Sequence, residues 1–366
     1  MIENKRLNYE LISLARDYRN LTQKELSDAI GIEQGTLSKI ENDILPIYQN
    51  DSLASEISKK LKFPIRFFLQ NIRIYNFEVG AHARKKQSVS INGHLIAKLN
   101  LIKSNIETLL RSIEIPESKI PNIICDEQNS PQQIANQVRK LLMIREGAIN
   151  NLSKILEDNG CIIYLDDLDV DSFSFSFHNH HIICLNKRSP IDRLRFTQAH
   201  ELGHLVMHKN QIANKEIECE ADSFASEFLM PSHLIREDFE IINVNKLHEL
   251  ANLKLKWKTS IQSIAMKAKD MGFLSEGGYR NLQVQISRLG YRKNEPYAFD
   301  RSIETASILR EIFDYYIKSL KYNLDQLSGI LYFHKEDFME IYKECLPNFT
   351  DNTPLPKLRV INGGVS

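Results

Sequence analysis

The stretch FTQAHELGHLVMH, residues 196–208, decides how the middle of this chain folds. It contains no proline, and its apolar residues have a spacing that suits the packed face of a helix. On one continuous helix, His200 and His204 are one turn apart, so both imidazoles project from the same face. Glu201 lies directly beside this pair.

Two imidazoles in this arrangement can bind one tetrahedral zinc ion while the intervening glutamate leans over the open coordination position. The HExxH pattern therefore indicates a peptidase site that holds Zn²⁺ through His200 and His204. In this hypothesis Glu201 is the base that activates water for hydrolysis of a peptide bond.

The segment IECEADSFASEFLMP, residues 217–231, predicts a second helix that completes the site. Glu218 and Asp222 are one turn apart on a common face of that helix. We expect Glu218 to be the third zinc ligand and Asp222 to accept the free ring N–H of a ligating histidine. Glu220 remains a competing ligand, although it lies on a different face.

Other histidines are weaker candidates for metal binding. His208 follows His204 by four residues, whereas the three-histidine pattern requires a glycine turn and a spacing of six. We expect His208 at the helix end or at the rim of the cleft, and His178, His180 and His181 in an exposed turn between strands. The oxyanion donor stays open among four residues: Tyr164, His178, His208 and Tyr279.

The first seventy residues predict short amphipathic helices in a compact unit. Thr22 and Glu25 have the spacing of a capping box, and Gly31 supplies a turn. The next helix would then present an exposed face to DNA, as a recognition helix does. The predicted DNA contacts are Gln23, Gln34, Thr36, Ser38 and Lys39.

Charge gives the chain no overall attraction to nucleic acid, because Lys plus Arg and Asp plus Glu number 47 each. Acidic and basic residues also balance over residues 1–70. Binding to DNA would therefore depend on a few placed cations, such as Arg16, Lys24 and Lys39. A helical module that binds only protein is the alternative for this segment.

For the whole chain we predict a mostly α protein with a small β-sheet, an α+β fold. Residues 161–167 indicate a buried strand, and the Phe–Ser alternation that follows is typical of a strand with one buried face. We expect a further strand over His181–Leu185 to lie at the edge of the cleft and to pair with a substrate peptide.

We predict four consecutive segments: residues 1–75 for DNA binding, a connector over 76–130, the metal-site domain over 131–275, and a helical subdomain over 276–366. In the last segment Asn323 and His334 are expected helix starts, and packing or dimerisation is favoured over ligand sensing. Neither an apolar leader nor an apolar run of about 20 residues is present. We therefore expect a cytoplasmic protein with no membrane partner.

Two stretches resemble known families. LTQKELSDAIGIEQGTLSKIEND, residues 21–43, is similar to the Cro/C1 (XRE) helix-turn-helix domains, which implies a five-helix-type DNA-binding fold over residues 7–70. RLRFTQAHELGHLVMH, together with ECEADSFASEFLMP, resembles the ImmA/IrrE zinc metallopeptidases, which implies a thermolysin-like fold around the zinc. YRNLQVQISRLGYRKNEP, residues 279–296, and the helices after it look like the C-terminal extension of such fusions.

The resemblances imply a DNA-binding transcription regulator fused to a zinc-dependent endopeptidase that hydrolyses a protein partner, such as a repressor. A toxin–antitoxin or stress response is the implied setting. The alternative is a repressor or antitoxin-like binder whose metal domain acts as a sensor or scaffold with little turnover. Double-stranded operator DNA is the other expected partner, and two-fold operators are consistent with a homodimer.

Overall fold

The computed structural model describes residues 4–72, 74–75, 81–84, 93–115, 117–177, 179–209, 211, 214–299, 304–346 and 359–360. The chain forms two compact units. Unit 1 contains Met1–Asn76, Ser90–Ile115 and Leu309–Ser366, and unit 2 contains Phe77–Val89 and Pro116–Ile308. Each unit therefore combines segments that are far apart in the sequence.

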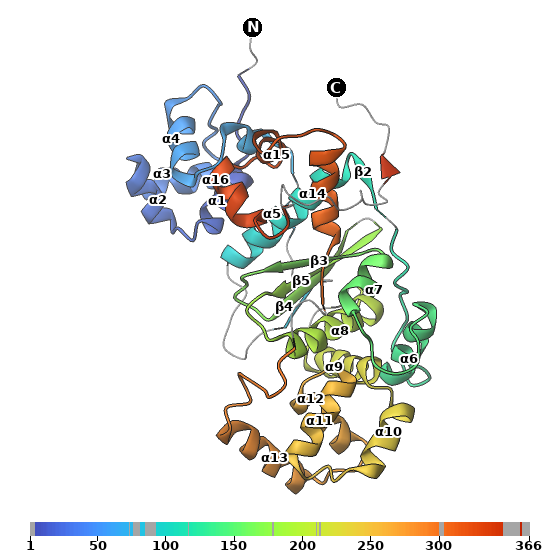
Figure 1. Cartoon of the computed structure of the whole chain (residues 1–366). Helices are drawn as coiled ribbons and strands as arrows, with labels where there is room; N and C mark the ends of the chain where they lie inside the picture. Colours follow the sequence, from blue (N-terminus) through green and yellow to red (C-terminus); the bar gives the residue numbers. More distant parts are fainter. Residues whose placement is uncertain are drawn as a thin grey trace. The chain divides into compact units, whose positions relative to one another are not determined.

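Unit 1 begins with a group of short helices around a buried apolar core (Figure 1). Thr22 and Glu25 form the predicted capping box at the start of the second helix, and Gly31 ends that helix with a φ of 73°. This left-handed conformation favours glycine and turns the chain into the next helix. The elements are α1 (Tyr9–Tyr18), α2 (Gln23–Ile30), α3 (Gln34–Glu41), α4 (Ser52–Leu61) and the 3₁₀-helix η1 (Ile65–Leu69).

The last helices of the chain pack with these first ones. Arg19, which follows the last residue of α1, forms an ion pair of 2.6 Å with Asp337 of α16, and the Phe63 and Phe333 rings are 5.6 Å apart. Asn323 and His334 precede two of these helices, as predicted. The elements are α5 (Gly93–Leu110), α14 (Ile308–Lys318), α15 (Leu324–Ile330), α16 (Lys335–Tyr342) and a small sheet of β2 (Ile113–Glu114) with β6 (Arg359–Val360).

Unit 2 contains a four-stranded mixed sheet in the order β1-β4-β5-β3. Strands β3 and β5 are parallel, whereas the other two pairs are antiparallel. The strands are β1 (Ala81–Arg84), β3 (Cys161–Asp166), β4 (Ser172–Phe177) and β5 (His180–Asn186). Because β5 lies between β4 and β3, the expectation that His181–Leu185 forms a free edge for substrate is wrong.

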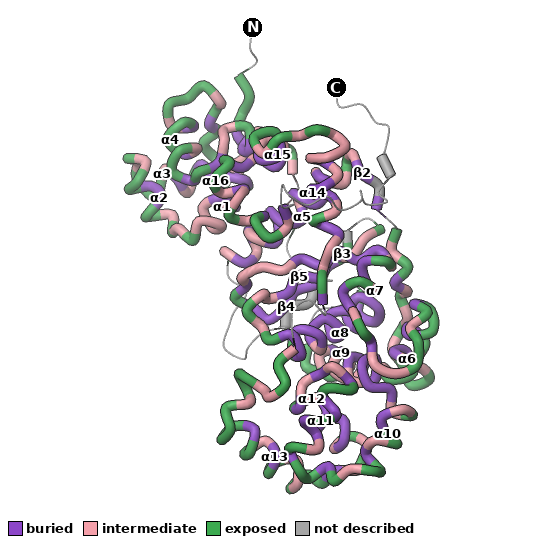
Figure 2. Tube along the Cα trace, viewed as in Figure 1, coloured by how far each residue is buried: buried purple, intermediate pink, exposed green. Residues whose placement is uncertain are grey.

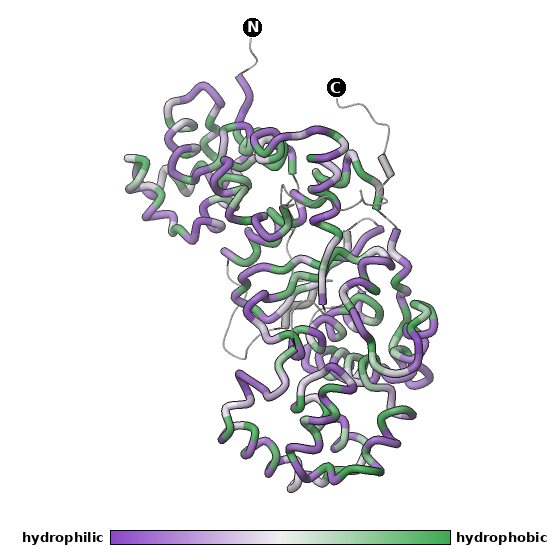
Figure 3. The backbone as a smooth tube through the Cα atoms, in the orientation of Figure 1, coloured by the Kyte–Doolittle hydropathy of each residue, from purple (hydrophilic) through white to green (hydrophobic). Residues whose placement is uncertain are grey.

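The described residues of unit 2 form eight helices beside this sheet, which confirms a mostly α fold with a small β-sheet. Figure 1 shows α8 against the sheet and α9 beside α8, with α10 to α13 beyond them. The outer helices alternate hydrophilic and hydrophobic residues (Figure 3), as amphipathic helices do. They are α6 (Pro131–Leu141), α7 (Leu152–Asp158), α8 (Ile191–Met207), α9 (Lys215–Leu229), α10 (Ser232–Ile241), α11 (Leu247–Trp257), α12 (Ile261–Asp270) and α13 (Glu276–Arg288).

Among the described residues, no helix combines the length and apolarity needed to cross a membrane.

Helix α8 is buried along almost its whole length, although it carries charged residues (Figure 2). Arg195 pairs with Glu304, and neither side chain is exposed to solvent. Glu304 also accepts hydrogen bonds from the backbone N–H groups of Leu152 and Ser153 at the start of α7. Residue 304 thus joins α7 and α8, although the chain reaches it only after α13.

Replacing Glu304 with Ala should leave Arg195 as a buried charge without its carboxylate. Loss of one partner of a buried ion pair costs about 3–5 kcal/mol, so the free energy of unfolding of unit 2 should fall by that amount. Urea denaturation monitored through Trp257, which is buried in unit 2, measures it. Glu276→Ala is the matched control, since Glu276 pairs with Lys269 at the surface; equal midpoints for both variants would contradict the prediction.

Candidate functional site

The candidate site lies where α9 packs closely against α8. A Cβ atom added at Gly203 would come within 3.1 Å of the Phe224 ring, so the missing side chain allows this close approach. Asn214 caps α9 by accepting hydrogen bonds from the N–H groups of Glu216 and Ile217. Glu218 therefore lies in the first turn of α9, where it faces the histidines of α8.

Three predicted metal-site residues converge at one point. The Nε2 atoms of His200 and His204 are 3.0 Å apart, and the carboxylate oxygens of Glu218 lie 3.3 Å and 3.4 Å from them. Ligand atoms around a tetrahedral zinc ion, at about 2.0–2.1 Å from the metal, are about 3.3 Å from one another. The three side chains therefore have the spacing of a single metal site.

A hydrogen bond to Nδ1 of His200 explains why the other ring nitrogen, Nε2, suits a cation. Asp222 lies 2.8 Å from Nδ1 of His200, as predicted for an outer carboxylate. A carboxylate only accepts, so Nδ1 carries the hydrogen, and Nε2 is left with a lone pair toward Glu218. A cation, either a metal ion or a proton, is needed where such acceptors meet.

The charge of Glu218 fits the same site. Burial raises the pKa of Glu218, but hydrogen bonds and positive charge from His200 and His204, when these rings hold a proton at the site, lower it by more. The net effect is a pKa below the ordinary value, so the carboxylate is ionised at neutral pH. Its side chain is 33% exposed, whereas both histidine side chains are 1% exposed, so the site reaches solvent on the α9 side.

Glu201 is fully buried and is held by the sheet. Its two carboxylate oxygens accept hydrogen bonds from the hydroxyls of Ser172 and Ser174 on β4. Burial raises the pKa of Glu201, while the charge of His200 and the two hydroxyls oppose this effect. The expectation that β4 has one buried face is wrong, because its serine face packs against α8 while Phe173 and Phe175 are also buried.

The other histidines differ from their predicted surroundings. His208 follows the last residue of α8, as expected for a helix end, but it is buried. Its Nε2 lies 2.8 Å from Glu220, so Glu220 contacts His208 and does not face the three converging side chains. His180 and His181 belong to β5 and are half-buried, so their expected place in an exposed turn is wrong. His178 lies outside the described residues.

Two of the remaining candidates for an oxyanion donor have other partners. The Tyr164 hydroxyl donates to Asp166 over 3.3 Å, and the Tyr279 ring lies 5.1 Å from the ammonium group of Lys269. Neither contact involves the three converging side chains.

The predicted DNA contacts lie on and around α3. Gln34 and Lys39 are exposed, and Thr36 and Ser38 are half-buried. Gln23 donates a 2.8 Å hydrogen bond to Glu41, which lies at the end of α3.

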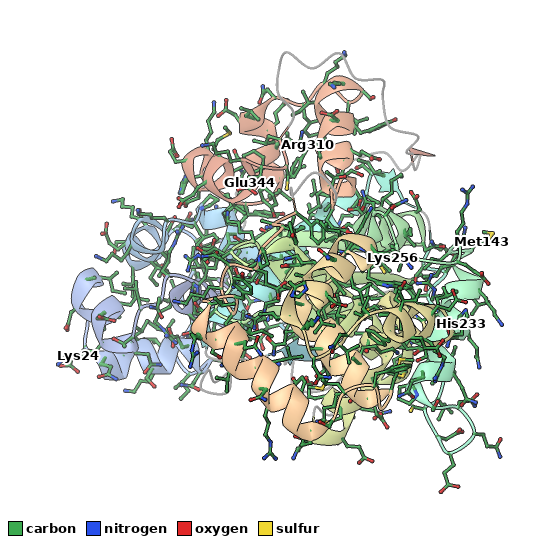
Figure 4. All side chains as sticks on the ribbon, turned by 60° about the horizontal axis from the view of Figure 1, so that its bottom comes forward. Lys24, Met143, His233, Lys256, Arg310 and Glu344 are labelled. Atoms are coloured by element: carbon green, nitrogen blue, oxygen red, sulfur yellow. The ribbon has the colours of Figure 1, made fainter. Side chains whose placement is uncertain are left out.

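The cations predicted to contact DNA are not equivalent. Arg16 forms ion pairs with Glu41 at 2.7 Å and with Asp17 at 2.6 Å, so its charge is compensated inside unit 1. Lys24 projects outward from α2 (Figure 4), and Lys39 is exposed on α3. These two lysines are therefore better placed than Arg16 to meet phosphates.

Two segments of the chain match models of known protein families. Residues 161–269, which include His200 and Glu218, match the model of the IrrE N-terminal-like domain. Residues 12–68, which include α2 and α3, match the helix-turn-helix model. The chain joins a helix-turn-helix domain to an IrrE N-terminal-like domain.

These matches confirm the resemblances to helix-turn-helix and ImmA/IrrE proteins, and the chain combines a DNA-binding domain with a metallopeptidase-like domain. The resemblance of residues 279–296 to a C-terminal extension stays a prediction. Among curated proteins, no sequence matches this chain significantly.

The hydrogen bond between Ser174 and Glu201 predicts that substitutions of these two residues have coupled effects on the free energy of unfolding. A hydrogen bond to a charged group contributes about 1.5–3 kcal/mol, so Ser174→Ala and Glu201→Ala should be non-additive by about that amount. Urea unfolding of the wild type, both single variants and the double variant, with a chelator present, measures it. Ser176→Ala is the control, because Ser176 is exposed on β4 and contacts His181. Additive effects for Ser174 and Glu201 would contradict the contact.

Proposed function

We propose that this chain is a DNA-binding transcription regulator fused to a zinc-dependent endopeptidase that hydrolyses a protein partner, such as a repressor. The observation that carries the proposal is the convergence of His200, His204 and Glu218, whose ligand atoms are 3.0–3.4 Å apart. The adjacent Glu201 and the family match over residues 161–269 support it further.

The donor set suits zinc, because two imidazole nitrogens and one carboxylate are the ligands of many catalytic zinc sites. Zinc bound there would polarise the carbonyl of a peptide bond and lower the pKa of a water molecule. Asp222 holds the His200 ring through Nδ1, which fixes the nitrogen that would face the metal. Glu218 would add a negative charge that strengthens binding of the ion.

Glu201 is the proposed general base. It would accept a proton from the attacking water and pass it to the leaving amine, so one carboxylate serves both halves of the reaction. Ser172 and Ser174 orient this carboxylate by donating to both of its oxygens. Each oxygen can accept a second hydrogen bond, but Glu201 is fully buried, so neighbouring side chains have to move before water reaches it.

That burial favours a second candidate function. If Glu201 stays buried, the metal domain binds zinc but hydrolyses little, and the chain acts as a repressor or antitoxin-like binder with a metal sensor or scaffold. The two functions differ in turnover and share the metal site.

Glu201→Gln separates the two functions. The variant should bind zinc within about 3-fold of the wild type, because the side chain is not a ligand, and should lose at least about 100-fold in cleavage rate. Chelator competition measures zinc affinity, and mass spectrometry of a proteome-derived peptide library measures cleavage. His200→Ala should lose zinc binding as well.

The outcomes of this comparison exclude one function or the other. Cleavage by the wild type alone supports the endopeptidase. Equal, background cleavage by the wild type and Glu201→Gln, with zinc bound to both, supports the sensor or scaffold. Zinc binding that is unchanged in His200→Ala would refute the metal site itself.

For the helix-turn-helix domain, we propose that α3 enters the major groove of operator DNA. Gln34 and Lys39 are the exposed residues of the predicted contact set, with Gln23, Thr36 and Ser38 around them. A homodimer would place two such helices on a two-fold operator.

Substitutions on α3 should separate base contacts from phosphate contacts. Gln34→Ala should cost about 1–3 kcal/mol and relax preference at one base position, as loss of a bidentate base contact does. Lys39→Ala should reduce the slope of log affinity against log salt by about 1 for every sequence. Titration of duplexes selected from a random library measures both.

Lys59→Ala is the matched control, because Lys59 is exposed on α4 and pairs with Glu56. If Gln34→Ala and Lys39→Ala both bind the duplexes as the wild type does, α3 is not the DNA-reading helix. If the wild-type chain selects no duplex from the random library, the result would instead support the alternative that this helical module binds only protein.

A further inference from the structure

A row of side chains leads away from the candidate metal site behind His204. Nδ1 of His204 lies 2.9 Å from Nδ1 of His208, and Nε2 of His208 lies 2.8 Å from a carboxylate oxygen of Glu220. We propose that His208 and Glu220 are positioning residues that fix the ring tautomer of His204 and thereby set the metal affinity of the site. This inference rests on the proposed metal-binding function.

The positions of the hydrogens follow from the ends of the row. Glu220 only accepts, so Nε2 of His208 carries a hydrogen, and in the neutral ring Nδ1 of His208 is an acceptor. His204 must then donate from its own Nδ1, which leaves its Nε2 with a lone pair. That lone pair faces Nε2 of His200 and the carboxylate of Glu218, so it is available to bind a metal ion there.

A second side chain, Cys125, also holds the Glu220 carboxylate in place. The Cys125 thiol hydrogen-bonds to Glu220, and burial, together with Glu220, raises the pKa of this thiol to about 11. The thiol is therefore protonated and donates to the carboxylate. Glu220 thus has two partners that draw it away from the metal ligands, although it is only two residues from Glu218.

The two ligand histidines are supported differently. His200 contacts the carboxylate of Asp222 directly, and that side chain is 50% exposed. His204 contacts the 1% exposed imidazole of His208, which in turn contacts the carboxylate of Glu220. The neutral imidazole keeps a further negative charge away from Glu201 and Glu218, since like charges in one buried site disfavour each other.

Three substitutions test the row. His208→Leu removes the acceptor for His204, and the affinity for zinc should fall about 10- to 100-fold, as it does when an outer partner of a ligand is lost. His208→Asn places an amide oxygen near the former Nδ1 and should stay within about 3-fold of the wild type. The zinc affinity of Glu220→Gln should fall between those of the two His208 variants. Glu216→Gln, one turn earlier on α9, is the control.

Zinc affinity is measured by chelator competition on the full chain, and the melting temperature of the metal-free protein is measured in parallel. Retained melting temperatures with a loss of affinity only in His208→Leu and, more weakly, Glu220→Gln support the proposal. An equal loss in His208→Leu and His208→Asn would mean that His208 acts by packing, and unchanged affinity in His208→Leu would also overturn the proposal.

A second measurement does not depend on zinc. Nitrogen-15 spectra of the metal-free chain, labelled at histidine and recorded where the rings are neutral, report which ring nitrogen of His204 carries the hydrogen. We expect Nδ1 in the wild type and a shift toward Nε2 in His208→Leu. A hydrogen on Nε2 in the wild type would refute the row, whereas unchanged zinc binding in His200→Ala would refute only the metal site.

Discussion

Burial of polar side chains on α8 is the constraint on which unit 2 depends. An unpaired charge in a protein core costs several kcal/mol, so each such residue requires a partner from another element. Arg195 is paired with Glu304, and Asp192 with Lys254, which also contacts Glu295. The family match ends at residue 269, but two of these partners follow it in the chain. The segment after α13 must therefore return to α8 for the helix to remain buried.

The same constraint has a different solution at the other end of α8. There the buried groups are the imidazoles of His200 and His204, and their outer nitrogens are occupied by Asp222 and His208. Their inner nitrogens face one another and the ionised Glu218, a grouping that is stable only with a cation between them. A metal ion would thus supply the counter-charge that ion pairs supply elsewhere along the helix. Stability of the fold and affinity for metal are linked through one element.

The sequence was sufficient to predict features that depend on neighbouring residues. The HExxH spacing, the Glu218 and Asp222 pair and the capping box of Thr22 all repeat at one helical turn, which local periodicity encodes. Partners from distant segments could not be predicted in this way. Neither the serines of β4 beside Glu201 nor Glu304 beside Arg195 has a local signal. The inner position of β5 also depends on strand order, which alternation within one strand does not specify.

In unit 1, the DNA-binding domain also depends on contacts with segments that are distant in the sequence. The helix-turn-helix match covers only residues 12–68, yet Arg19 pairs with Asp337 and Phe63 packs beside Phe333. The first and last parts of the chain therefore fold together, and the metallopeptidase-like unit is inserted between them in sequence. Loss of the C-terminal helices would expose apolar surface of the helix-turn-helix domain and leave Arg19 without this carboxylate. Any regulation that releases or displaces those helices would consequently act on DNA binding through packing, without a change in α3 itself.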